Sequence, residues 1–236
     1  MKKKWLYIIG IIVLVVPVLF FYHAFNGNPV WKAVSTNALK NYLKDTYPQD
    51  EFRIHDGFYN FKISGYTYEV IKIGEDGQGY EFEVTRFFKP TVSYDGIYYA
   101  NLDLPLMEKL QDEAANEISD ALNMDSIVNI GVQIEVLQGT YDADTQWSKD
   151  LQLEKPIYIH LTMDVTNMSK EEVFTAVQSI KQKLDSAGYQ YDRVSFNGNM
   201  FDGKFGDKDE FGYLKYAVGF DQDSNITIKN IEEYNQ

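Results

Sequence analysis

The chain contains no cysteine among its 236 residues. This absence excludes disulfides, thiolate metal sites, a cysteine nucleophile and the lipid-modified cysteine of a bacterial lipoprotein. Any exported part of the chain must therefore depend on its hydrophobic core for stability. The length is sufficient for such a core, in one large domain or two small ones.

Familiar catalytic and cofactor motifs are also missing. The sequence has no G-x-S-x-G, H-E-x-x-H, G-x-x-x-x-G-K-[ST] or G-x-G-x-x-G, so serine-hydrolase elbows, zincin sites, P-loops and Rossmann fingerprints have no sequence support. Only three histidines occur, and His23 lies near the end of the apolar N-terminal segment, at the predicted membrane boundary. This leaves His55 and His160 as candidate bases or ligands.

Both histidines are predicted to be solvated surface residues. His55 precedes Asp56-Gly57, a turn signal. His160 lies on the polar face of a predicted strand, about 13 Å from Asp164 at ~3.3 Å per residue, which is too far for a dyad. We therefore predict no catalytic residue, no cofactor-binding residue, no metal ligand and no cofactor.

Two acidic loops are weak candidates for cation binding. Asp142 and Asp144 form a D-x-D pattern in a long predicted connection. Residues 202–210 are rich in oxygen ligands of the kind that Ca²⁺ prefers, but Lys204 and Lys208 add positive charge and the EF-hand pattern is absent. We predict ordinary acidic loops, and cation binding at residues 202–210 stays an open alternative.

Positive charge is scarce and unevenly placed. The formal net charge is −13, and removing Lys2, Lys3 and Lys4 from the 22 Lys and Arg leaves 19 against 35 Asp and Glu. Such a surface repels phosphate backbones, so no nucleic-acid binding is predicted. The same net charge predicts repulsion from anionic lipid headgroups.

Residues 5–25 form the one long apolar segment and contain no Asp, Glu, Lys or Arg. A helix of this length spans roughly 32 Å at ~1.5 Å per residue, about the thickness of a bilayer core. A cleaved signal peptide is the competing interpretation, but bulky Tyr22 and Phe25 occupy the −3 positions of the plausible cleavage sites. We predict a retained single-pass anchor, with Lys2 to Lys4 cytoplasmic and everything after Phe25 extracytoplasmic.

Periodicity predicts a helix and then strands in the first half of the chain. A helix is expected over residues 30–47, before Pro48, and strands over 59–63, 66–70 and 80–84. The glycine-rich residues 74–79 predict a hairpin loop, and Asp95-Gly96 predicts a turn. Tyr98 and Tyr99 are expected on a strand, where neighbours point to opposite faces and one ring is therefore exposed.

The second half predicts helix, strand, strand, helix, strand, strand. Helices are expected over residues 104–124 and from the capping box Ser169 to Glu172 as far as Gly188. Strands are expected over residues 130–136, 157–165, 191–196 and 211–220, with long connections at 138–156 and 197–210. The predicted fold class is α+β, with antiparallel sheets packed against about three helices. The predicted domains are residues 1–27 (tail and anchor), 28–102 and 103–236.

Several sequence segments resemble the YfjL-like family of membrane-anchored proteins from Gram-positive bacteria. They are the start MKKKWLYIIG, the helix LKNYLKDTYPQDEF, the strand YNFKISGYTYEV and the β-rich C-terminal half. The resemblance covers essentially the whole chain and rests on arrangement, not on a catalytic signature. It implies a two-part ectodomain of unassigned function and transfers no active-site residue.

The functional expectation is a non-enzymatic interaction module at the cell surface. The chain has 18 Tyr and 15 Phe, and exposed aromatic rings provide large contact areas for an envelope protein partner or for self-association. The alternative is a carbohydrate- or peptidoglycan-acting hydrolase that uses carboxylates. With 35 acidic residues, carboxylate pairs are expected from composition alone.

Overall fold

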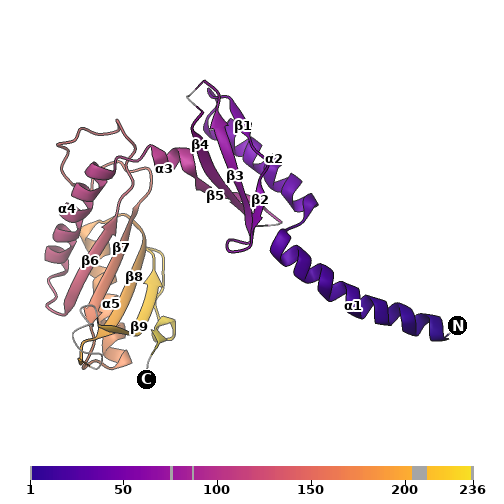
Figure 1. Cartoon of the computed structure of the whole chain (residues 1–236). Coiled ribbons are helices and arrows are strands. Elements are labelled where there is room, and N and C mark those ends of the chain that lie inside the picture. The colour runs from indigo at the N-terminus through magenta and orange to yellow at the C-terminus, as the bar shows by residue number, and fades with distance from the viewer. Residues whose placement is uncertain (1, 75–76, 87, 204–211, 235–236) are drawn as a thin grey trace. The chain divides into compact units, whose positions relative to one another are not determined.

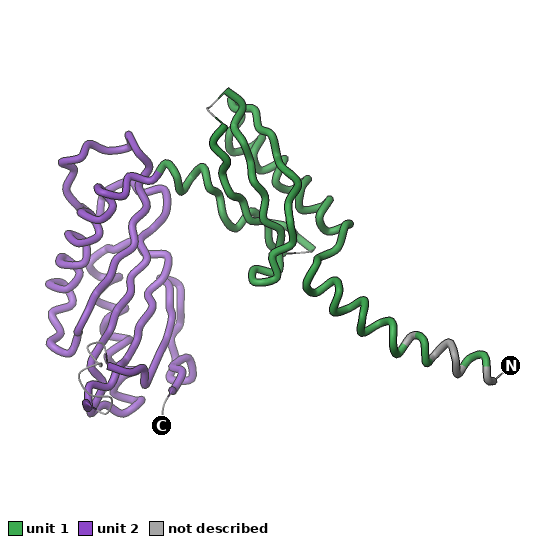
Figure 2. The backbone as a smooth tube through the Cα atoms, viewed as in Figure 1, with its two compact units in different colours: residues 1–101 green, residues 102–236 purple. Residues whose placement is uncertain are grey.

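The computed structural model describes residues 2–74, 77–86, 88–203 and 212–234, without the side chains of residues 2–3, 6–9 and 12. The chain forms two compact units, Met1–Asn101 and Leu102–Gln236, coloured separately in Figure 2. Each unit has its own sheet and its own hydrophobic core. The units are described one at a time.

Unit 1 begins with α1 (Lys2–Asn26), which carries Pro17 in its interior. Its described side chains from Val13 onward are exposed all around the helix. Of the described residues, one helical region near the N-terminus is long and apolar enough for a membrane span or a signal sequence. A helix that is apolar on every side and unburied has no protein core to face.

The rest of unit 1 is a helix packed on one face of an antiparallel sheet (Figure 1). The helix is α2 (Pro29–Thr46), and the strands are β1 (Phe52–Ile54), β2 (Phe58–Asn60), β3 (Gly65–Lys72), β4 (Gly79–Thr85) and β5 (Thr91–Asp95). The strand order is β1-β3-β4-β5, and β2 also pairs with β3. Leu39 and Leu43 of α2 share the core with buried residues of β3 and β4.

Two sequence predictions for unit 1 were wrong. Tyr98 and Tyr99 lie in a short helix, α3 (Gly96–Ala100), because the Asp95 carboxylate accepts hydrogen bonds from the backbone N–H groups of Ile97 and Tyr98. This N-cap outweighs the strand preference of the aromatic residues. The strand predicted over residues 59–63 ends at Asn60, and a turn follows.

Unit 2 is a five-stranded sheet covered on one face by two helices (Figure 1). Its elements are α4 (Leu104–Leu122), β6 (Ile127–Gln133), β7 (Ile157–Asp164), α5 (Lys170–Ala187), β8 (Tyr191–Met200), β9 (Tyr213–Phe220), a 3₁₀ turn (Ile228–Asn230) and β10 (Glu232–Glu233). The strand order is β10-β9-β8-β7-β6. β7 and β8 are parallel because α5 connects them as a crossover, and the other pairs are antiparallel.

The α+β class with mostly antiparallel sheets is confirmed, as is the capping box at the start of α5. The Ser169 side chain accepts a hydrogen bond from the Glu172 N–H, and the Ser169 N–H donates to the Glu172 carboxylate over 2.8 Å. The helix ends at Gly188, whose φ of 81° suits glycine. By contrast, the loop predicted from residue 197 was wrong at its start, because β8 continues to Met200 between β7 and β9.

Candidate functional site

The face of the unit 2 sheet opposite α4 and α5 forms the candidate site, and we call it the helix-free face. Strand alternation turns Ile157, Ile159 and Leu161 into the core, so the intervening residues of β7 point the other way. The pairing register of β6, β7, β8 and β9 then places side chains of all four strands beside one another on this face. The helix-free face carries Gly131 and Gln133 of β6, Tyr158, His160 and Thr162 of β7, Arg193, Ser195 and Asn197 of β8, and Ala217 and Gly219 of β9.

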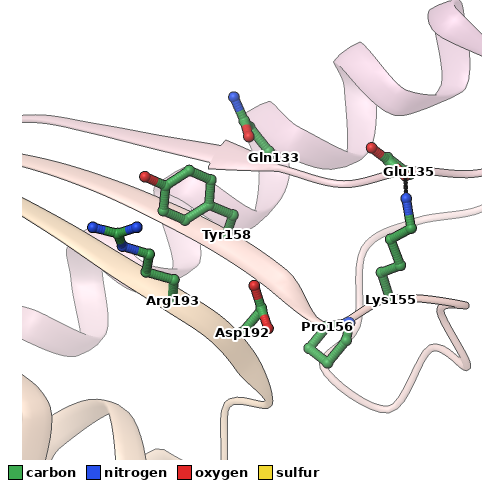
Figure 3. A pocket seen from close by; sticks show the side chains of 7 residues that line it. All are labelled: Gln133, Glu135, Lys155, Pro156, Tyr158, Asp192 and Arg193. Atoms are coloured by element: carbon green, nitrogen blue, oxygen red, sulfur yellow. Dashed lines mark hydrogen bonds and ion pairs between the residues drawn. The ribbon is translucent and has the colours of Figure 1, made fainter. Parts of the chain in front are cut away.

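A hollow of about 430 Å³ lies where β6, β7 and β8 meet on this face. Its lining residues, drawn in Figure 3, are Gln133, Glu135, Lys155, Pro156, Tyr158, Asp192 and Arg193. The volume is within the range of small-molecule and peptide sites. The Tyr158 ring lies between the side chains of Gln133 and Arg193, as their paired backbone positions require.

The two cations that line this hollow differ in whether they form an ion pair. The Lys155 ammonium is 2.5 Å from a Glu135 carboxylate oxygen, so these two groups neutralise each other. Arg193 forms no ion pair with any residue that the structure describes. Arg193 is thus an available cation in a chain of net charge −13.

Arg193 is placed by a glycine on the neighbouring strand. A Cβ atom added to Gly219 would be 2.6 Å from the Arg193 Nη2, so only glycine lets the guanidinium lie across β9. There Arg193 also lines a second hollow of about 350 Å³, together with Ser195, Asn230 and Glu232. One guanidinium therefore borders two hollows on the helix-free face.

His160 differs from the predicted solvated histidine. Its ring centroid is 4.2 Å from that of Tyr158, and its Nε2 is buried without a hydrogen-bond partner in the described part of the chain. Such an orphaned polar atom is uncommon in proteins. The structure does not bring His160 to Asp164, in agreement with the distance expected along the strand.

The other predicted candidates are not assembled into a site. The exposed His55 ring is 2.8 Å from Glu69 in a cross-strand pair, and Asp142 and Asp144 are exposed. Among the described residues, no group of three or more His, Asp or Glu could hold a metal ion. Most of the acidic segment at residues 202–210 lies outside the described residues, while Asp202 accepts a 2.6 Å hydrogen bond from the Tyr213 hydroxyl.

The glycine-rich segment at residues 74–79 connects β3 and β4, which pair as an antiparallel hairpin. Residues 75 and 76 lie outside the described part. Gly74 and Gly77 have φ of 98° and 74°, as expected for a tight hairpin loop.

Much of the tyrosine content serves the fold. The hydroxyls of Tyr42 and Tyr47 donate to one oxygen of the buried Asp95 over 2.8 and 2.7 Å. Burial, then the hydrogen bond and negative charge of Asp95, raise the pKa of Tyr42 to about 12. In unit 2, Tyr189 donates to Glu117 and Tyr191 to Asp185, and burial is the main cause of the raised pKa of each phenol.

The residues that line the hollow of about 430 Å³ were not predicted as a site. Glu135 and Lys155 lie near the two ends of the long connection between β6 and β7, and Asp192 and Arg193 come after a whole helix. The only available signal was the alternation of polar residues on β7, which includes Tyr158. That alternation cannot reveal which strand lies beside β7.

The chain belongs to the YfjL-like family. The N-terminal domain of that family matches residues 2–96, and its C-terminal domain matches residues 113–233. Among curated proteins, the chain is similar to the uncharacterized protein YfjL of Bacillus subtilis, with 27% identity over 217 residues and 91% of each chain covered.

A solved structure with some likeness is that of a DUF5037 family protein from Ruminococcus gnavus. The match covers 81% of this chain and 95% of that chain, at 12% sequence identity and a TM-score of 0.27. A likeness this remote carries no argument about function.

Proposed function

We propose that this protein is held in the cell membrane by α1, with both units on the outer side, and that unit 2 binds a partner through its helix-free face without catalysing a reaction. The partner class is a segment of another envelope protein or of a second copy of this chain. The observation that carries the proposal is the uncovered sheet face with an unpaired Arg193 between two hollows.

The anchor is supported by the composition of α1 and by the charges before it. A 25-residue helix at ~1.5 Å per residue is roughly 37 Å long, enough to cross a bilayer. Lys2, Lys3 and Lys4 precede the apolar stretch, and a positive N-terminal flank stays on the cytoplasmic side. This orientation makes both units extracytoplasmic.

Binding at the helix-free face is supported by its chemistry. Tyr158 offers a flat ring with a hydroxyl, and Arg193 offers five donors in a planar fork. Both residue types are enriched at the centres of protein interfaces. Gly131 has no side chain and Ala217 has only a methyl group, so a partner can approach the backbone of β6 and β9 at these two positions.

A hydrolase is the second candidate, because Glu135 and Asp192 both line the hollow of about 430 Å³. A general acid or base needs a carboxyl group that is free to exchange a proton with the substrate. Glu135 is held by Lys155 in an ion pair, which opposes that role. This contact favours binding over hydrolysis.

A photoreactive amino acid at Tyr158 of the full-length chain tests the binding proposal in intact cells. We expect one dominant adduct from this position and none from the exposed Gln182 on α5, which serves as the control. Adding Arg193→Glu should abolish the adduct. Equal capture from both positions, or capture that survives Arg193→Glu, would contradict the binding face.

Two further measurements test the rest of the proposal. An export-dependent reporter enzyme fused after Gln236 should be active, and a cytoplasm-dependent reporter should be inactive; the reverse result would sink the orientation. Purified full-length chain should release no fragments from cell-wall glycan. Release that disappears in Glu135→Gln and Asp192→Asn would establish the hydrolase instead.

A further inference from the structure

One end of the unit 1 sheet carries an unusual group of side chains, and this end is where α1 joins. Strand pairing sets Tyr66 opposite Val84 and Thr85 opposite Thr91, so the β2–β3 turn and the β4–β5 loop lie at the same end. We call this end the anchor-proximal rim. It is defined by Phe58, Phe61 and Phe88 together with Lys62, Arg86 and Lys89.

The three phenylalanines of the rim are exposed to an extent that folding alone does not explain. Phe58, Phe61 and Phe88 are 62%, 55% and 96% exposed. The Phe88 ring packs edge-to-face with the Trp31 ring, with centroids 5.7 Å apart. Clustered exposed aromatic rings of this kind mark a binding or membrane surface.

The cations of the rim contrast with the acidity of the whole chain. Lys62, Arg86 and Lys89 are exposed and form no ion pair within the ranges that the structure describes. The exposed Asp56 is neutralised by Lys32 over 2.6 Å. The rim is therefore locally basic, although the net charge of −13 predicted repulsion from anionic lipids.

The join between α1 and the sheet fixes the level of the rim. The Tyr66 hydroxyl accepts from the Asn28 N–H over 2.8 Å and donates to the Asn28 carbonyl over 2.7 Å. The Phe25 ring, in the last turn of α1, contacts the Phe61 ring with centroids 5.8 Å apart. From Trp5 to Phe25 the helix rises about 30 Å, the thickness of the hydrocarbon core, so Phe25 and with it Phe61 lie at the outer interface.

A hollow of about 640 Å³ opens at the same level. It is lined by the end of α1, including Tyr22 and Phe25, and by Phe58 and Tyr59 of β2. Aromatic rings beside cations are typical of side chains that rest among lipid headgroups.

We propose that the anchor-proximal rim of unit 1 docks onto the outer leaflet, with Phe58, Phe61 and Phe88 among the lipid headgroups and Lys62, Arg86 and Lys89 against anionic phosphates. The inference rests on the proposed membrane anchor. It adds that unit 1 itself binds the lipid surface, beyond being tethered to it.

The absence of cysteine makes the test direct. Full-length variants Phe61→Cys and Phe88→Cys carry an environment-sensitive fluorophore and are reconstituted in vesicles whose acyl chains bear a bromine quencher. Ile73→Cys is the matched control, because Ile73 is 53% exposed beyond the opposite end of the same sheet. We expect strong loss of emission at positions 61 and 88 and none at position 73.

The outcomes separate the two proposals. A chain that fails to float with vesicles overturns the anchor and the docking together. A chain that floats while all three labels stay bright, or are equally quenched, overturns the docking alone. Quenching at positions 61 and 88 only supports it.

A separate experiment tests whether unit 1 prefers anionic lipid headgroups. Replacing part of the phosphatidylcholine by phosphatidylglycerol should deepen the quenching at position 88. Lys62→Glu changes the charge by two units and should lower the docking equilibrium constant about 25-fold, at roughly fivefold for each unit of charge. Arg53→Glu, on β1 at the far end of the sheet, is the control and should change nothing. Equal quenching in both lipids would overturn the role of anionic headgroups.

Discussion

The two units differ in how their sheets and helices are stabilised. Each covers one face of a sheet with helix, but the core of unit 2 contains 26 buried residues among those described and the core of unit 1 contains 8. With so few buried residues, unit 1 depends more on the hydrogen bonds of partly buried tyrosine hydroxyls: Tyr42 and Tyr47 donate to Asp95, and Tyr66 donates to the backbone carbonyl of Asn28. A small domain cannot bury enough apolar surface to be stable by that alone, so polar bonds matter more in unit 1.

The largest expected effect is a charge in the core of unit 2. Val177 of α5 is fully buried, and Val177→Asp should lower the free energy of unfolding by about 4 kcal/mol or more, because a carboxylate would be buried without a partner. Hydrogen exchange of the full-length chain should show lost protection in unit 2 only. Gln182→Ala, on the exposed side of the same helix, should change little, and equal loss of protection in unit 1 would show that the two cores are not independent.

A smaller effect is expected from the polar centre of unit 1. Asp95 is 7% exposed and accepts four hydrogen bonds, two from tyrosines and two from the start of α3. Asp95→Ala should cost about 3 kcal/mol in unit 1, since it leaves buried donors unpaired and removes an N-cap. Tyr42→Phe removes a single bond and should cost about 1 kcal/mol. If thermal unfolding ranked the two variants the other way, the proposed dependence of unit 1 on polar bonds would be wrong.

Two glycines give a matched comparison between the units. Gly27 and Gly139 have φ of 72° and 78°, but a Cβ would be 2.6 Å from the Tyr66 hydroxyl at Gly27 and would meet nothing within 4 Å at Gly139. Gly139→Ala should therefore cost about 1 kcal/mol from backbone strain alone, and Gly27→Ala about 2 kcal/mol. Calorimetry in detergent measures both, and equal costs would refute the close approach of Tyr66 to the join.

The smallest expected effect on stability at neutral pH comes from the ionisation of the tyrosine hydroxyls, and this effect grows at alkaline pH. The pKa of Tyr42 is raised to about 12 in the fold, compared with about 10 for an unfolded tyrosine. Its contribution to stability is complete below about pH 10 and is lost as the pH rises towards 12. Urea midpoints should fall over this window, and Tyr42→Phe should flatten the fall in unit 1. An unchanged slope in that variant would exclude Tyr42 as a cause.

Local signals predicted the parts of the fold that local chemistry determines. The capping box at Ser169 and the glycine stop at Gly188 define α5, and both are confirmed. The prediction of a strand at Tyr98 and Tyr99 failed although the deciding group, the Asp95 carboxylate, is also local. In the sequence, the signal of an N-cap for a helix of only five residues is weaker than the strand pattern around it, so the pattern alone predicted a strand.

The candidate site could not be predicted because it depends on contacts between distant strands. Tyr158 and Arg193 are neighbours only because α5 returns the chain in parallel, and Arg193 lies flat only because Gly219 faces it from β9. The polar run from Asn197 to Met200 looks like a loop by composition. It becomes strand because β7 and β9 supply hydrogen bonds on both sides.

The break between α1 and α2 at Gly27 and Asn28 also affects how far the sheet of unit 1 lies from the end of α1. Without it, α1 and α2 would run on as one rod from residue 2 to residue 46, about 67 Å long at ~1.5 Å per residue. Under the proposed membrane anchor, such a rod would hold the sheet of unit 1 well clear of the bilayer. Instead, Gly27 has a left-handed backbone conformation, and the Asn28 N–H donates a hydrogen bond to the Tyr66 hydroxyl. The chain therefore turns between α1 and α2, which under the proposed anchor keeps the sheet close to the bilayer. Under the proposed membrane anchor, the height of the unit 1 sheet above the bilayer thus depends on two residues that belong to neither helix.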